Sequence, residues 1–154
     1  MTATHATFTI ERTLKASPAR VWKAFADQGA KDEWFTGAPD WVRTERSFDF
    51  RVGGRETSSA GPKGGTQHIF DAVYQDIVPG ERIVFTYSLY MDQARMSVSI
   101  TTIEFEPAGA GTRLKFTEQG VFLLDPADAA EREHGTRFLM DKVEASLADE
   151  TARA

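Results

Sequence analysis

The chain has 154 residues and a net charge of −5, which suits one domain with one core. The acidic balance argues against binding to nucleic acid or to anionic membranes, and the absence of cysteine excludes disulfides, thiolate nucleophiles and cysteine-ligated metals. No apolar run approaches the ~18 residues of a membrane span, and the N-terminus lacks the pattern of a signal peptide, so we expect a cytoplasmic protein.

The N-terminal part predicts a strand followed by two short helices. Residues 8–14 alternate between apolar and polar side chains, apart from Arg12, which is typical of a half-buried strand. Ser17 suits a helix N-cap and Pro18 suits the first helical position, so a short helix is expected to begin there. A second short helix is expected over residues 30–34.

The middle of the chain predicts strands joined by hairpins. Strands are expected at residues 48–52, 68–74, 83–90, 96–105 and 112–118, and a flexible hairpin tip at 58–65. Within 96–105 the apolar parity changes, because Val98 and Ile100 point one way while Ile103 and Phe105 point the other. A bulge near residues 101–102 would reconcile the two halves.

The C-terminal part predicts one long helix over about residues 127–149. Its apolar stripe consists of Thr136, Leu139, Met140, Val143 and Leu147. An antiparallel meander must cover its apolar face, and this helix is the only large element left to do so. We therefore predict an α+β fold in which a curved antiparallel sheet wraps around the helix, as one domain over residues 1–154 with an ordered core at about 6–149.

Several segments resemble the START-like superfamily, also called SRPBCC or Bet v-like. Val21-Trp22-Lys-Ala-Phe25 with Glu33-Trp34-Phe35 is similar to its opening, and residues 74–86 are similar to its central hairpin. Residues 111–122 and 135–143 resemble its last strand and its final helix. The resemblance covers nearly the whole chain and is nearest to the bacterial branch named after the activator of heat-shock protein 90 ATPase.

This resemblance implies a helix-grip fold with seven strands and an internal ligand cavity. Many members of the branch carry Trp after the Gly of the final helix, where this chain has Thr136, and the smaller side chain would leave more room in the cavity. The family does not fix the function, because its relatives range from lipid carriers and hormone receptors to polyketide cyclases.

Polar side chains on the inner face of the sheet are the most informative candidates for a site. Arg12 and Glu118 follow the inward parity of their strands, so each needs a partner, and the two could pair with each other. They form either a structural ion pair near the sheet rim or a polar anchor or general acid/base. His68 and Tyr74 share one parity and raise the same question. The remaining candidate ligand-binding residues are Phe48, Phe50, Phe70, Phe85, Tyr87, Thr136, Met140 and Val143.

Three functions are compatible with these expectations. The first is binding of a small hydrophobic or amphipathic molecule between the sheet and the final helix. The second is a cyclase- or dehydratase-type enzyme acting on a polyketide-like substrate, with Glu118, His68 and Tyr74 as its only candidate residues. The third, which the name of the branch implies, is a co-regulator of a chaperone ATPase. We expect no cofactor, and no metal site, since the three histidines are far apart in sequence.

Phe138 lies almost opposite the apolar stripe of the final helix. It is either exposed, covered by residues 119–126, or buried in a twofold contact between two copies of the chain. A homodimer is therefore one of the expectations.

Overall fold

The computed structural model describes residues 2–153, with the side chains of residues 2–148. Within this range the chain forms three helices and a seven-stranded antiparallel sheet in the order β1-β7-β6-β5-β4-β3-β2. The strands are β1 Thr4–Leu14, β2 Trp41–Phe48, β3 Arg55–Pro62, β4 His68–Val78, β5 Arg82–Met91, β6 Ala94–Ala108 and β7 Gly111–Phe122. The helices are α1 Pro18–Ala26, α2 Gln28–Trp34 and α3 Asp128–Arg153.

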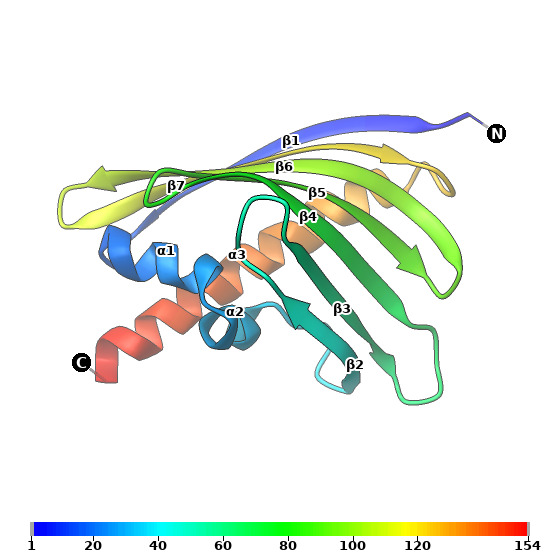
Figure 1. The fold of residues 1–154 in the computed structure, drawn as a ribbon, viewed down its shortest axis with the longest axis horizontal. Coiled ribbons are helices and arrows are strands. Elements are labelled where there is room, and N and C mark those ends of the chain that lie inside the picture. The colour runs from blue at the N-terminus through cyan, green and yellow to red at the C-terminus, as the bar shows by residue number, and fades with distance from the viewer. Residues whose placement is uncertain (1, 154) are drawn as a thin grey trace.

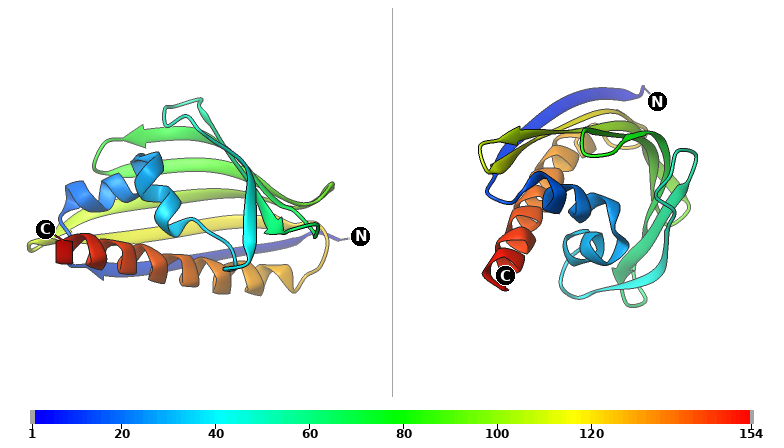
Figure 2. Two further views of the ribbon diagram at one scale, coloured as in Figure 1. Left: turned by 90° about the horizontal axis from the view of Figure 1, so that it is seen from below. Right: turned by 60° about the vertical axis from the view of Figure 1, so that its left-hand side comes forward.

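The sheet is strongly curved, and all three helices lie on its concave side (Figures 1 and 2). The long helix α3 runs beneath β1 and β7, and α1 and α2 lie beside it. Met140, Val143 and Leu147 of α3 are buried, as the predicted stripe requires. The architecture predicted from the sequence is therefore confirmed.

Two side-chain caps define the short helices. The hydroxyl of Ser17 accepts a hydrogen bond from the backbone N–H of Arg20 at 3.4 Å, and Pro18 occupies the first helical position, as predicted. Asp27 ends α1 and caps α2, since its carboxylate accepts from the N–H of Ala30 at 2.9 Å. The second helix thus begins two residues earlier than its apolar pattern indicated.

The strand boundaries predicted for the segment between α2 and β4 were wrong. A strand was expected at 48–52, but β2 ends at Phe48 and residues 49–54 form the connection to β3. Gly53 in that connection has a φ of 83°, which favours glycine. The stretch expected as a flexible tip is largely strand β3, whose small side chains pack in the ladder between β2 and β4.

The prediction of a bulge in β6 near residues 101–102 was also wrong. Its register with β7 is continuous from Ser97 to Ala108, so side chains alternate regularly along the strand. Val98 and Ile100 therefore lie on the convex face, each 38% exposed, while Ser97 points inward. Between β5 and β6 the irregularity lies at residues 89–90 of β5.

Phe138 is 58% exposed on the outer side of α3, so residues 119–126 do not cover it. The ammonium of Lys142 lies 5.0 Å from the centre of its ring. Self-association through this face stays a prediction. No helix within residues 2–153 has the length and hydropathy needed to span a membrane.

Candidate functional site

Five polar side chains on the concave face converge around the guanidinium of Arg132. We call this group of six the Arg132 cluster: Tyr87, Ser97, Ser99, Thr101, Glu118 and Arg132. Nη1 of Arg132 donates to the hydroxyl of Tyr87 at 2.8 Å and to Oε2 of Glu118 at 3.3 Å, and Nη2 donates to the hydroxyl of Ser97 at 2.7 Å. The other carboxylate oxygen, Oε1, accepts from Tyr87 at 2.8 Å and from Thr101 at 3.1 Å. The side chains of Glu118 and Arg132 are only 2% and 11% exposed.

The Arg132 cluster lies on the concave side of the sheet, toward the end at which α3 begins (Figure 2). Along β4 the inward side chains become more exposed from Tyr74 through Phe70 to His68. The same trend runs along β5 from Tyr87 to Leu89. The inward side chains are thus more exposed toward the end of the sheet that carries the cluster.

Small residues lie beside the cluster on the sheet. Across the sheet, Ser99 pairs with Gly120, and Gly120 pairs with Ala6. The packing at Gly120 is tight, because a methyl group added there would lie 3.0 Å from the hydroxyl of Ser99 and 3.1 Å from the ring of Phe122. On α3, Thr136 is buried one turn after Arg132.

A second group of charges lies between α2 and strands β2, β3 and β4. We call it the Glu56 cluster: Lys31, Asp32, Arg46, Glu56 and Tyr74. Oε1 of Glu56 accepts from the ammonium of Lys31 at 2.7 Å and from the hydroxyl of Tyr74 at 2.5 Å, while Oε2 accepts from Nη1 of Arg46 at 2.7 Å. Nε of Arg46 also donates to Asp32 at 2.9 Å. Five aromatic rings surround the Lys31 ammonium, with centres 4.8–5.9 Å away.

Burial and charge act in opposition on the ionisable groups of the Glu56 cluster. Burial lowers the pKa of Lys31, because the charged ammonium is removed from water, and Glu56 only partly compensates. Burial alone would raise the pKa of Glu56. The charge of Lys31 and hydrogen bonds from Lys31, Tyr74 and Arg46 outweigh that effect, so the pKa of Glu56 is lowered from 4.5.

We expect Glu56 to remain ionised at a pH where exposed glutamates are already protonated. Because its folded pKa lies below its unfolded pKa, its contribution to stability is complete above pH 4.5 and is lost as the pH falls toward the folded value. A titration of the Glu56 side-chain carboxyl by ¹³C NMR, in the folded protein and in urea, checks this. Equal Glu56 titration midpoints in the two states would contradict it.

Arg12 and Glu118 do not pair with each other. Arg12 points toward α3, where it donates to Asp141 at 2.7 Å and lies 3.8 Å from Glu144. Glu118 is opposite Phe8 in the β1–β7 register, four residues or roughly 13 Å along the strand from Arg12. Both side chains follow the predicted inward parity, but their expected contact was wrong.

The three candidate acid/base residues lie in three separate places. Glu118 belongs to the Arg132 cluster and Tyr74 to the Glu56 cluster. His68 stacks on Trp41, with ring centres 4.4 Å apart, and partial burial lowers the pKa of His68. The structure therefore does not bring these residues together as one catalytic group.

The predicted aromatic and helix residues connect the two clusters. The ring of Phe70 lies 4.9 Å from Tyr87 and 6.2 Å from Phe85, and Lys31 lies 5.9 Å from both Phe70 and Phe85. Phe48 and Phe50 stack on each other beside Tyr74, a member of the Glu56 cluster. Thr136, Met140 and Val143 are buried on α3.

Sequence reasoning missed the cations and Glu56. Lys31 and Arg46 carry no sequence signal of burial, because lysine and arginine on a short helix and a polar strand are ordinarily exposed. Arg132 did carry a signal: it extends the stripe of Thr136 and Met140 one turn toward the N-terminus.

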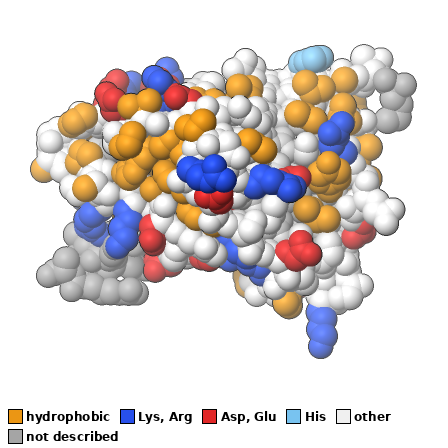
Figure 3. Space-filling view, viewed as in Figure 1, with side chains coloured by type: hydrophobic (Ala, Val, Ile, Leu, Met, Phe, Trp, Pro, Cys, Tyr) orange, Lys and Arg blue, Asp and Glu red, His pale blue; other side chains and the backbone are white. Residues whose placement is uncertain are grey.

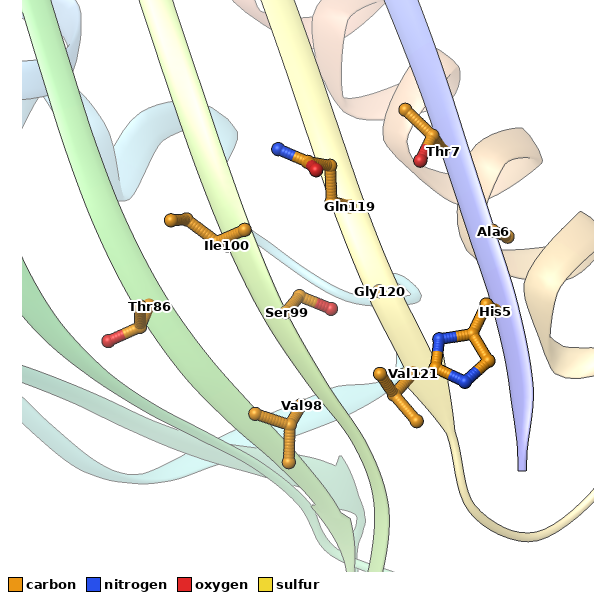
Figure 4. Close-up of a pocket in the computed structure, with 10 residues that line it drawn as sticks. All are labelled: His5, Ala6, Thr7, Thr86, Val98, Ser99, Ile100, Gln119, Gly120 and Val121. Atoms are coloured by element: carbon orange, nitrogen blue, oxygen red, sulfur yellow. The ribbon is translucent and has the colours of Figure 1, made fainter. Parts of the chain in front are cut away.

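A shallow depression of about 410 Å³ lies on the convex face of the sheet (Figure 4). Its outward side chains include Val98, Ile100 and Val121, together with His5 and Gln119. Hydrophobic side chains also lie among charged ones on the face of the molecule shown in Figure 3. This depression is on the opposite side of the sheet from the two polar clusters, so it is separate from the candidate site.

Comparison with known proteins identifies the family. Residues 15–148 match the model of the Activator of Hsp90 ATPase homolog 1-like protein family. The chain belongs to this family. The resemblance seen in the sequence is thereby confirmed, and no curated protein matches the chain.

Solved structures of relatives agree with this assignment. The protein Mll3558 from Rhizobium loti is 46% identical, with a TM-score of 0.86 over 95% of this chain and 99% of that one. A putative uncharacterized protein from Rhizobium leguminosarum is 41% identical, with a TM-score of 0.90 over 96% and 97% of the two chains. An AHSA1-like protein from Aeromonas hydrophila, 19% identical with a TM-score of 0.70 over 95% and 94% of the two chains, shares the fold.

Proposed function

We propose that the protein binds a small amphipathic molecule in the groove between the sheet and α3. The apolar part of the ligand lies against the aromatic rings and the stripe of α3, and its polar group contacts the Arg132 cluster. The observation that carries this proposal is the convergence of polar side chains from β5, β6, β7 and α3 on the concave side of the sheet, beside inward-facing aromatic rings. One or two polar anchors in an apolar concavity are typical of small-molecule sites.

The exposure of individual rings supports the apolar part of the site. Phe70, Phe85 and Tyr87 point into the groove and retain 8–9% exposure, whereas Ile10 and Leu114, also inward-facing, retain 1%. The rings near the Arg132 cluster therefore border space that water can reach.

The enzymatic alternative has no comparable support. A cyclase or dehydratase needs an acid and a base facing the same open space. Glu118 is enclosed by Tyr87, Thr101 and Arg132, and neither His68 nor Tyr74 lies in its cluster. The geometry thus favours binding over chemistry.

Binding of a neutral fluorescent probe tests the proposal. N-phenyl-1-naphthylamine is expected to bind the wild-type protein, and 1-decanol is expected to displace it. Arg132→Met should weaken decanol binding by about tenfold, equivalent to about 1.4 kcal/mol. Arg137→Met is the control, because Arg137 pairs with Glu133 on the exposed side of α3. Failure of the wild type to bind either molecule, or equal decanol affinities in both folded variants, would rule out the proposed site.

A further inference from the structure

We infer that the polar group of the ligand is uncharged: the Arg132 cluster accepts a neutral oxygen, such as that of a ketone, an ester or an alcohol, in preference to a carboxylate. This inference rests on the proposed function, since it specifies which molecules the same groove binds. It follows from the charge balance of the cluster and from the hydrogen-bond donor that the cluster leaves free.

The charges of the Arg132 cluster already cancel. Arg132 and Glu118 form an ion pair at 3.3 Å, and the remaining members of the cluster are hydroxyl groups. Tyr87 stays neutral, because burial raises the pKa of its hydroxyl. A carboxylate placed here would leave one net negative charge in a poorly solvated site, which is costly.

A further carboxylate lies one turn before Arg132. Asp128 is in the first turn of α3, four residues before Arg132 and so on the same face of the helix. Its charge interacts favourably with the positive end of the helix dipole, which would otherwise attract an anion.

The group left free in the cluster is a hydrogen-bond donor. Ser97 is fully buried and accepts from Arg132, so it is out of reach of a ligand. Among the described residues, Nε of Arg132 has no acceptor. Donors without partners are complemented by an oxygen acceptor, and a ketone supplies one without adding charge.

Exchange of one charge in the cluster tests the inference. The affinities of 2-decanone and decanoate are measured at pH 8 by displacement of N-phenyl-1-naphthylamine. Decanoate leaves water less readily than decanone, so the decisive quantity is the change in their affinity ratio between proteins. Glu118→Gln preserves shape but leaves the charge of Arg132 unpaired, and the ratio is expected to shift toward decanoate by at least about tenfold.

Glu133→Gln is the matched control, because it changes the net charge equally on the exposed side of α3 and should leave the ratio unchanged. Arg132→Lys provides a second measurement that keeps the positive charge of the ion pair but removes the free Nε–H, and it should weaken decanone binding about fivefold. An unchanged ratio in folded Glu118→Gln, or unchanged decanone affinity in folded Arg132→Lys, would overturn the inference while leaving the proposed groove intact. If neither ligand displaces the probe from the wild type, the proposed function itself fails.

Discussion

Glu56→Gln is expected to lower the free energy of unfolding by about 3–5 kcal/mol, the usual cost of removing one partner from a buried ion pair. Glu56 is 1% exposed and accepts hydrogen bonds from Lys31, Arg46 and Tyr74. The amide of glutamine cannot balance the two cations, and its NH2 group would face at least one donor. Lys31 has no other carboxylate within hydrogen-bond distance among the described residues. Urea denaturation at pH 7 measures the effect.

An exposed ion pair on neighbouring strands supplies the control. Arg55 of β3 and Asp71 of β4 form a bidentate pair whose side chains are 63% and 32% exposed, so Asp71→Asn should cost less than about 1 kcal/mol. The double variant Lys31→Met/Glu56→Gln should cost less than the sum of its single changes, because the two residues share one interaction. A loss below about 1 kcal/mol for Glu56→Gln would show that the cluster does not hold α2 against the sheet.

The parts of the fold that the sequence predicted correctly are those governed by local rules. Ser17 and Pro18 start α1 because a hydroxyl cap and a missing N–H both suit the first turn of a helix. Residues 8–14 and 112–118 alternate because one face of each strand packs against α3 and the other faces solvent.

The prediction for β6 failed because the alternation rule assumes that inward residues are apolar. Ser97 and Thr101 face inward since Arg132 and Glu118 supply their hydrogen-bond partners. Val98 and Ile100 are then left on the convex face, where nothing in the described chain covers them. Arg132, on a helix far away in sequence, thus explains why inward positions at the start of β6 are polar and outward positions are apolar.

Long-range pairing explains the remaining failures in the candidate site. Arg12 was expected near Glu118 because both have inward parity, but parity fixes a face of the sheet and not a position along the strand. Lys31 is buried only because the folded chain places Glu56, 25 residues away in sequence, within 2.7 Å of its ammonium. No local sequence pattern around Lys31 or Glu56 indicates that the two residues are in contact.

Thr136→Trp is expected to weaken binding of N-phenyl-1-naphthylamine by at least about tenfold. Thr136 is 6% exposed, lies on the inward stripe of α3 between Arg132 and Met140, and donates its hydroxyl to the backbone carbonyl of Arg132. An indole at this position would occupy the space between α3 and the sheet in which we place the ligand. The helix carbonyl keeps its backbone partner, so the loss of the threonine hydroxyl is a minor effect.

Stability separates a filled groove from a damaged fold. If the groove is open, the indole enters existing space and the free energy of unfolding changes little; if the groove is packed, the larger side chain costs about 1–3 kcal/mol. Phe138→Trp on the opposite side of α3 is the control, because that side chain is 58% exposed and should leave probe affinity unchanged. A Thr136→Trp protein that is destabilised and still binds the probe as tightly as the wild type would place the ligand elsewhere. A stable variant with lost binding would locate the ligand beside Arg132, because only an occupant of that space competes with the indole.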